Sequence, residues 1–208
     1  MIELVRDANG SYTCPTDPGE PELRTPRVSV TDAEAEQIAK WCAGLRVVEF
    51  GTGLGVSTRA IAKTAAEVIT FDVDQWVQQS VWPTLPPKIK TAPSPLMTVE
   101  GTYLMDSKTD GNIECRSCHR FVSVKRCGVE LCDDCHRYQA DAAFIDGCHH
   151  RAAVEKDVRE AFRLVKPDGL IILHDWNAGD VQDGARDAGF VPFAVMQTAH
   201  GLAIGRRP

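Results

Sequence analysis

Short apolar runs rich in β-branched residues recur along this chain and constrain its fold more than any other feature of the sequence. Four of them have the character of buried strands, at residues 46–50, 68–72, 142–146 and 170–175. They alternate with stretches of helical periodicity, which is the pattern of a mostly parallel sheet with helices on both faces. The sequence therefore predicts an α/β fold of the doubly wound type.

Helices are expected before and between these strands. Residues 31–44 begin with a capping box, in which Thr31 is followed three residues later by Glu34. Residues 56–66 are rich in alanine, and the helix before the last parallel strand places Phe162 and several valines on one face. Each of these stretches can cover one side of the predicted sheet.

The remaining strands are predicted from turns and prolines. Five prolines within residues 75–95 exclude a long regular element there, so a short helix is expected first and the third strand at residues 96–100. Residues 190–197 and 201–205 are separated by only three residues, which predicts an antiparallel hairpin. The predicted sheet therefore ends on an antiparallel strand.

Five of the eight cysteines lie within residues 114–136. Two C-x2-C pairs, separated by 13 residues, can each present two thiolates from one turn and together complete a tetrahedral zinc shell. The predicted ligands are Cys115, Cys118, Cys132 and Cys135. Cys127 is surplus to this set, and it, His119 or His136 could replace one of the four. Four cysteines leave no open coordination position, so we expect a structural zinc.

The cysteine pairs lie in the connection between the third and fourth predicted strands, which is too long for an ordinary loop. We expect residues 107–138 to form a zinc-binding insertion within a main domain of residues 29–208, preceded by an N-terminal extension at residues 1–28. The insertion holds six basic and five acidic residues and few aromatics. This composition gives no support for nucleic-acid binding.

Composition also limits the classes of function. The formal net charge of -6 gives no overall attraction for a phosphate backbone, so a nucleic acid is not the expected partner. No apolar run approaches the ~20 residues of a membrane-spanning helix, and the first residues do not resemble a signal peptide. We expect a cytoplasmic protein with no membrane partner, and the sequence leaves homo-oligomers open.

A glycine-rich turn, EFGTGLGVST, follows the first predicted strand. Gly51, Gly53 and Gly55 allow a sharp turn and close approach of a ligand, next to the N-terminus of a predicted helix. Val56 stands where a dinucleotide-binding loop would have its third glycine, which argues against an NAD enzyme. Asp72 ends the next strand, where an acid that binds ribose hydroxyls is expected.

These residues resemble the class I S-adenosylmethionine-dependent methyltransferases. VVEFGTGLGVST is similar to their first motif, and FDVD to their second-strand acid. AAFIDGCHHRAAVEKDVREAFRLVKPDGLIILHDW resembles the IDG-x-H … L-x-KPGG … HD signature of a small-molecule O-methyltransferase branch akin to macrocin and catechol O-methyltransferases. The resemblance covers residues 31–106 and 140–206. It implies a seven-stranded sheet of order 3-2-1-4-5-7-6 with the last strand antiparallel.

The resemblance also implies a set of residues that bind S-adenosylmethionine. They are Glu49, Gly51, Gly53, Gly55, Asp72, Gly101 and Thr102. Glu49 and the glycines would surround the methionine part of the cofactor, and Asp72 would bind the ribose hydroxyls. The last two residues would lie near adenine.

Asp146 and Asp175 correspond to positions that bind a divalent metal in several relatives. Independently, carboxylates at the ends of neighbouring parallel strands, about 4.8 Å apart, can share a hard cation such as magnesium. Such an ion would polarise a substrate hydroxyl and align it with the methyl group. His149 matches the histidine after IDG and His174 precedes Asp175, so either is a candidate general base.

The chain departs from the resemblance at three positions. Cys148 and Arg151 replace an acid and a tyrosine that relatives often have around the histidine, which bears on the substrate and on metal dependence. Asp168 replaces the first glycine of the KPGG turn, a mild change because aspartate tolerates turns.

Three functions from different classes follow. The first is metal-assisted methyl transfer to a hydroxyl of a small molecule, such as a sugar or a phenol. The second is a protein or RNA methyltransferase that uses the zinc-binding insertion to dock a macromolecule. The third is a non-catalytic cofactor-binding or assembly protein. Acids at the ends of four strands favour an enzyme, and the acidic net charge favours a small substrate over RNA.

Overall fold

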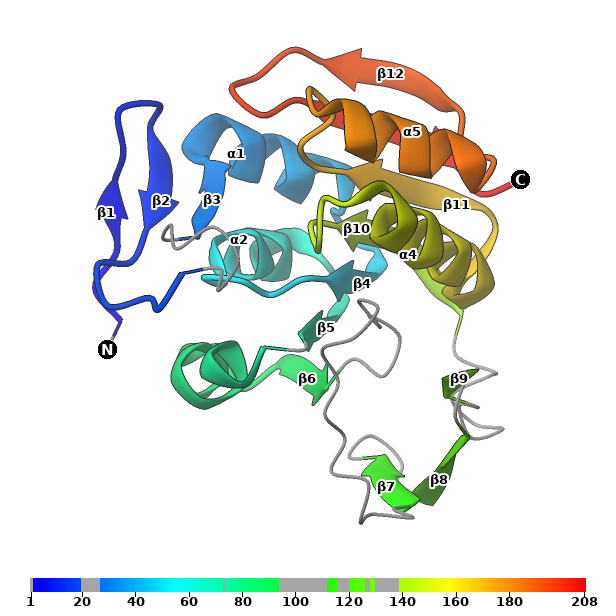
Figure 1. Cartoon of the computed structure of the whole chain (residues 1–208), viewed down its shortest axis with the longest axis horizontal. Coiled ribbons are helices and arrows are strands. Elements are labelled where there is room, and N and C mark those ends of the chain that lie inside the picture. The colour runs from blue at the N-terminus through cyan, green and yellow to red at the C-terminus, as the bar shows by residue number, and fades with distance from the viewer. Residues whose placement is uncertain are drawn as a thin grey trace.

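The computed structural model describes residues 2–19, 27–72, 74–93, 112–115, 120–125, 128–129 and 139–208. Seven strands form one central sheet in the order β12-β13-β11-β10-β4-β5-β6 (Figure 1). Their bounds, in sheet order, are Pro192–Met196, Leu202–Arg206, Val165–Leu173, Ala140–Ile145, Arg46–Phe50, Glu67–Asp72 and Ile89–Pro93.

The strand directions agree with the predicted topology. β11, β10, β4, β5 and β6 are parallel neighbours, and β13 runs antiparallel to both β11 and β12. Numbered along the chain within this sheet, the order is 3-2-1-4-5-7-6, so the predicted doubly wound α/β fold is confirmed. The order reverses between β4 and β10, which is where open α/β sheets bind ligands.

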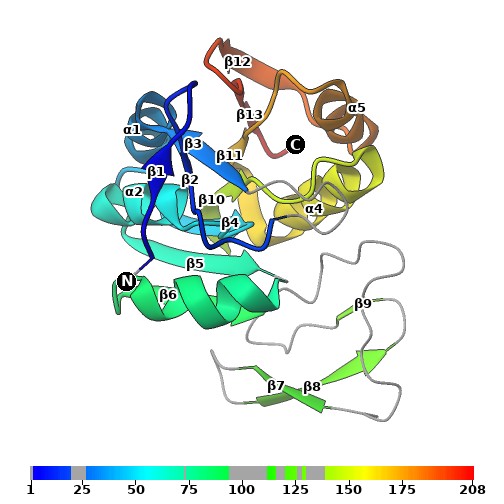
Figure 2. The same ribbon diagram turned by 60° about the vertical axis from the view of Figure 1, so that its left-hand side comes forward.

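Strand β4 shows why the sheet carries helices on both faces. Val47 packs in one core cluster with α1 (Asp32–Trp41) and α2 (Val56–Thr64). Val48 packs in a second cluster with α4 (Arg151–Leu164) and α5 (Gly179–Asp187). Because successive side chains of a strand point to opposite faces, β4 is apolar on both sides. Figure 2 shows the two pairs of helices on either side of the sheet.

Helix α1 begins at the predicted capping box. Thr31 accepts a hydrogen bond from the backbone N–H of Glu34, whose side chain accepts one from the backbone N–H of Thr31. Helix α5 was not predicted, since Val181 and Ala185 are the main apolar residues that it buries and no side chain caps its start. None of the helices in the described ranges is long and apolar enough to cross a membrane.

The strand beside β5 differs from the prediction. It is β6, which ends at Pro93, whereas the predicted residues 96–100 lie outside the described part of the chain. A proline is tolerated here because β6 stands at the end of the described sheet, where one side of its backbone has no neighbouring strand. The predicted short helix precedes it, as a π-helical turn at Val77–Val81 and a 3-10 turn at Trp82–Thr84.

The N-terminal residues form a small sheet. β1 (Val5–Arg6), β2 (Ser11–Thr13) and β3 (Val28–Thr31) pair antiparallel in that order. β3 continues directly into α1, so the chain connects this small sheet to the first helix that packs on the central sheet. Part of the predicted N-terminal extension is therefore regular structure.

Three short strands are described between β6 and β10. β7 (Asn112–Cys115) pairs antiparallel with β8 (Arg120–Lys125), which pairs with β9 (Gly128–Val129). The backbone of Cys115 ends β7. The other predicted zinc ligands, Cys118, Cys132 and Cys135, lie outside the described residues, so the zinc site stays a prediction.

Asp157 on α4 is an acid in the core. It is 2% exposed, and its Oδ2 has no hydrogen-bond partner in the described structure. Burial raises the pKa of Asp157 to about 7. Because this pKa lies above the value of ~3.9 for an unfolded chain, the folded state binds more protons between these two pH values. Stability therefore falls as the pH rises from about 4 to about 7.

We expect Asp157→Asn to stabilise the fold above pH ~7 by on the order of 2–4 kcal/mol, because asparagine carries no charge to bury. The free energy of unfolding, measured by urea denaturation at several pH values, should depend less on pH in this variant than in the wild type. Asp183→Asn, at a half-exposed side chain on α5, is the matched control and should follow the wild type. A variant with an unchanged pH dependence would contradict the assignment.

Candidate active site

The predicted site residues gather at the carboxyl edge of the parallel strands. Gly51 follows β4, Asp72 ends β5, Asp146 follows β10, and Asp175 lies two residues beyond β11. Because these strands are parallel neighbours, the residues that follow them meet at one edge of the sheet. Both halves of the chain therefore contribute to one site.

The glycine-rich loop adopts backbone conformations that favour glycine. Gly51, Gly53 and Gly55 have φ angles of 90°, 48° and 74°. At Gly51 a β-carbon would lie 2.1 Å from the carbonyl oxygen of Asp146, so the loop packs directly against the chain after β10. Gly55 is the N-cap of α2 and no side chain caps this helix, which leaves its first N–H groups available to a ligand.

Asp72 is buried and holds the glycine loop. Its carboxylate accepts hydrogen bonds from the backbone N–H groups of Gly53, at 2.9 Å, and Asp74, at 2.8 Å. Burial raises the pKa of Asp72, and these two hydrogen bonds oppose the shift. A carboxylate oxygen can accept more than one hydrogen bond, so acceptor capacity remains for ribose hydroxyls.

Glu49 lies behind the glycine loop. It is fully buried, and its two oxygens accept hydrogen bonds from Ser57, at 2.7 Å, and Thr58, at 2.6 Å. Burial raises the pKa of Glu49 to about 7. These contacts join β4 to the first turn of α2, and the predicted contact with the cofactor stays a prediction. Two other predicted residues, Gly101 and Thr102, lie outside the described residues.

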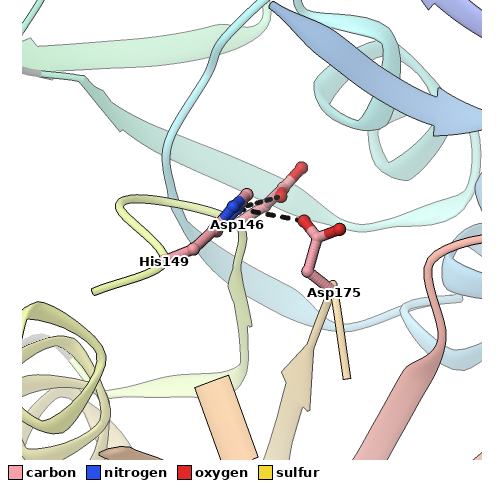
Figure 3. A group of neighbouring side chains, drawn as sticks. All are labelled: Asp146, His149 and Asp175. Carbon is pink, nitrogen blue, oxygen red and sulfur yellow. Dashed lines mark ion pairs between the residues drawn. The ribbon is translucent and has the colours of Figure 1, made fainter. Parts of the chain in front are cut away.

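Asp146, His149 and Asp175 form a compact group at the ends of β10 and β11 (Figure 3). His149 Nε2 lies 3.0 Å from Asp175 Oδ2 and 4.0 Å from Asp146 Oδ1, and one ligand atom of each residue lies within 4.8 Å of the others. Two ligands bound ~2.1 Å from a cation are about 3.0 Å apart at right angles and about 4.2 Å apart when opposite. The donor set therefore fits a divalent cation after a small side-chain movement.

The two aspartates also set the charge of His149. The neighbouring carboxylates of Asp146 and Asp175 raise the pKa of His149 to about 10, against the effect of burial. At neutral pH this side chain is therefore an imidazolium that balances the two carboxylates. A cation held by the same carboxylates would take over that role and lower the pKa of His149, because like charges repel.

His174, the other candidate base, is buried. It is 4% exposed, and its Nδ1 lies 3.0 Å from Asp146 and 2.9 Å from Asp175. Its Nε2 faces Glu34 at 3.4 Å, without a hydrogen bond in the described structure. Burial opposes a charge on this ring, but the neighbouring carboxylates raise the pKa of His174 well above its ordinary value. Of the two histidines, His149, with 49% of its side chain exposed, is the one that an acceptor can reach.

Two members of this network were not predicted from the sequence. Glu34 is fully buried and accepts hydrogen bonds from the Thr198 hydroxyl and the backbone N–H of His200. His200 lies between β12 and β13, with Nδ1 3.4 Å from Asp175 and its ring centre 5.1 Å from that of His174. The capping box marks Glu34 as a helix start, whereas no motif marks His200.

Comparison with known proteins supplies the family. Residues 48–176 match a family model described as a methyltransferase domain. The tRNA (m1A58) methyltransferase TrmI from Aquifex aeolicus has a TM-score of 0.53 and 16% identity, over 86% of this chain and 70% of that one. An O-methyltransferase family protein from Burkholderia thailandensis has a TM-score of 0.53 and 12% identity, over 84% and 55%. An S-adenosylmethionine-dependent methyltransferase from Mesorhizobium loti has a TM-score of 0.53 and 13% identity, over 84% and 96%.

At these identities the solved structures establish the fold alone, and no curated protein matches the sequence significantly. The sheet order and the family match together define a class I S-adenosylmethionine-dependent methyltransferase. More particularly, the chain belongs to the methyltransferase-domain family, whose model spans the glycine loop, Asp72, Asp146 and Asp175. The methyl acceptor is a separate question.

Proposed function

We propose that this protein transfers a methyl group from S-adenosylmethionine to a hydroxyl of a small molecule, assisted by a divalent metal. The observation that carries the proposal is the group of Asp146, His149 and Asp175 beside the glycine loop. An acceptor hydroxyl needs activation before methyl transfer, and this group combines metal-binding carboxylates with an accessible imidazole. Family membership supports the cofactor and the class of enzyme.

Each side chain of the group has a distinct proposed role. A bound divalent cation would supply Lewis acidity that lowers the pKa of the acceptor hydroxyl. Asp146 and Asp175 would hold the cation, and His149 would complete the ligand set or take the hydroxyl proton at Nε2. His174 would position both aspartates from the buried side, through the hydrogen-bond distances of its Nδ1.

The donor set bears on the choice of metal. Two carboxylates suit magnesium, which the sequence suggested, whereas an imidazole nitrogen is a ligand that manganese and other transition metals accept more readily. We therefore propose that manganese(II) binds at least as well as magnesium. Asp175 has a positive φ of 52°, an uncommon backbone conformation that supports a functional placement of this carboxylate.

The predicted zinc site is retained as a separate proposal. It rests on the spacing of Cys115, Cys118, Cys132 and Cys135. A closed shell of four thiolates would stabilise the chain between β6 and β10 and would take no part in methyl transfer. The two metals are therefore proposed to have independent roles.

The test of the proposed function is calorimetric titration with S-adenosylmethionine, in EDTA and again with magnesium or manganese. We expect the wild type to bind the cofactor and Asp72→Asn to bind it about 10- to 100-fold more weakly, because a charged acceptor for the ribose hydroxyls is lost. The control Asp183→Asn, at a half-exposed side chain on α5, should bind as the wild type does. No binding by folded wild-type protein would contradict the proposal, and equal affinity of Asp72→Asn would remove Asp72 from the cofactor site.

A further inference from the structure

Residues of the N-terminal segment contact the candidate active site, and the proposed function gives these contacts no role. Ser11, Cys14 and Asp17 are all buried, although they precede the main sheet in sequence. Figure 2 shows the chain that follows β2 crossing in front of the central sheet. We call residues Ser11–Gly19 the strap. Arg27, the residue before β3, donates a hydrogen bond to Asp17 of the strap.

One end of the strap is joined through His200 to Asp175, one of the proposed metal ligands. Ser11 Oγ lies 2.8 Å from His200 Nε2, and His200 Nδ1 lies 3.4 Å from Asp175 Oδ1. Ser11 is fully buried. One imidazole therefore links the strap to Asp175, and movement of this end of the strap must break a buried contact.

The other end of the strap is joined to the ribose side of the site through Arg27. The guanidinium of Arg27 donates a hydrogen bond to Asp17 at 2.6 Å and also pairs with Asp74, two residues beyond Asp72. Its Cζ lies 5.4 Å from the centroid of the Trp76 ring, in a cation–π contact. The Asp17 side chain is fully buried and that of Arg27 is 15% exposed, so solvent screens this ion pair only weakly.

The length of the strap matches the span between these two contacts. Asp175 follows β11 and Asp74 follows β5, which are three strand positions apart in the sheet, or about 14–15 Å. The six residue-to-residue steps from Ser11 to Asp17 can extend over at most about 20 Å. The strap therefore passes the ends of β10 and β4, which carry Asp146 and the glycine loop.

We propose that the strap closes over the bound cofactor and that the cofactor leaves when the strap is released. His200 and Arg27 are positioning residues that fasten its two ends. The inference rests on the proposed function only in that S-adenosylmethionine binds at this edge of the sheet. It adds that the rate of cofactor release depends on His200 and Arg27, which do not touch the reacting atoms.

The experiment is stopped-flow displacement of S-adenosylmethionine from the metal-loaded protein. We expect Ser11→Ala and Arg27→Gln each to raise the dissociation rate constant about tenfold or more, because each removes one fastening. Lys40→Gln is the matched control. Lys40 lies on α1 and pairs with Glu36, and both side chains are more than half exposed, so its loss should leave release unchanged.

Substitutions of His200 separate fastening from packing. His200→Asn places an amide where Nδ1 faced Asp175 and gives up the contact with Ser11, whereas His200→Gln can reach Ser11 and gives up the contact with Asp175. Faster release in the asparagine variant than in the glutamine variant is the expected result. A purely structural role of His200 would make both release rates change together with melting temperature.

Hydrogen exchange gives a readout that does not depend on any substitution. The backbone amides of residues 11–19 should exchange more slowly when S-adenosylmethionine is added. The inference would be overturned if Ser11→Ala and Arg27→Gln both released the cofactor at the wild-type rate and S-adenosylmethionine did not slow hydrogen exchange in the strap. That result would leave the proposed function intact. Failure of the folded wild type to bind the cofactor at all would overturn both.

Discussion

Asp175→Asn is expected to remove divalent-metal binding at the site and to lower kcat/KM by about 1,000-fold or more, because Lewis-acid activation is worth several kcal/mol. The substitution changes one carboxylate oxygen to an amide and leaves the side-chain shape almost unchanged. Asparagine also adopts positive φ readily, so the backbone of this position, at φ 52°, is retained. The loss can then be attributed to the missing charge.

Calorimetric titration with manganese(II) measures this effect without knowledge of the methyl acceptor. The wild type should bind about one ion at this site in the presence of S-adenosylmethionine, and Asp175→Asn should bind none there. The matched control is Asp168→Asn, which makes the same chemical change at an aspartate with φ 61° in the long strand β11. Equal manganese affinity in Asp175→Asn and the wild type would show that this group holds no metal.

Gly51→Ala is expected to destabilise the fold by roughly 3–5 kcal/mol. A β-carbon would lie 2.1 Å from the backbone oxygen of Asp146, and neither backbone can move without disturbing the pairing of β4 with β10. The φ of 90° adds a conformational cost for any residue other than glycine. The same displacement would shift Asp146, so metal affinity should fall with stability.

Gly44→Ala separates the cost of the steric clash from the cost of the backbone conformation. Gly44 also has a positive φ, 73°, but a β-carbon there would meet no atom within 4 Å. This control should therefore cost only about 1 kcal/mol, for the left-handed backbone conformation. Urea denaturation of both variants gives the comparison, and a loss in Gly51→Ala no larger than that in Gly44→Ala would show that the loop and β10 are not in tight contact.

The strands that are buried on both faces could be predicted from the sequence because their apolar runs are continuous. RVVEF and LIILHD are such runs, and both lie in the middle of the sheet. β6 was misplaced because its sequence, IKTAP, contains a lysine and a proline that a strand at the end of the described sheet tolerates. Helix α5 was missed for a related reason, since few of its side chains enter the core.

The acids of the site could be predicted because parallel topology brings the residues after neighbouring strands together. This argument works for Asp72, Asp146 and Asp175, each of which follows or ends an apolar run. It cannot reach Ser11 and His200, which lie 189 positions apart and meet through the three-dimensional fold. Their residue types are ordinary for loops, so only the contact itself reveals them.

The boundary between β4 and β10 separates the two parts of the chain that supply the candidate active site. Gly51 and Asp72 belong to the chain up to Pro93, and Asp146, His149 and Asp175 belong to the chain from Ala140 onward. Under the proposed function, substitutions in the second part can therefore change the surroundings of the acceptor while Gly51 and Asp72 stay in place. The two parts are coupled, because Gly51 packs against the backbone of Asp146 and because Ser11 and Glu34 both contact His200.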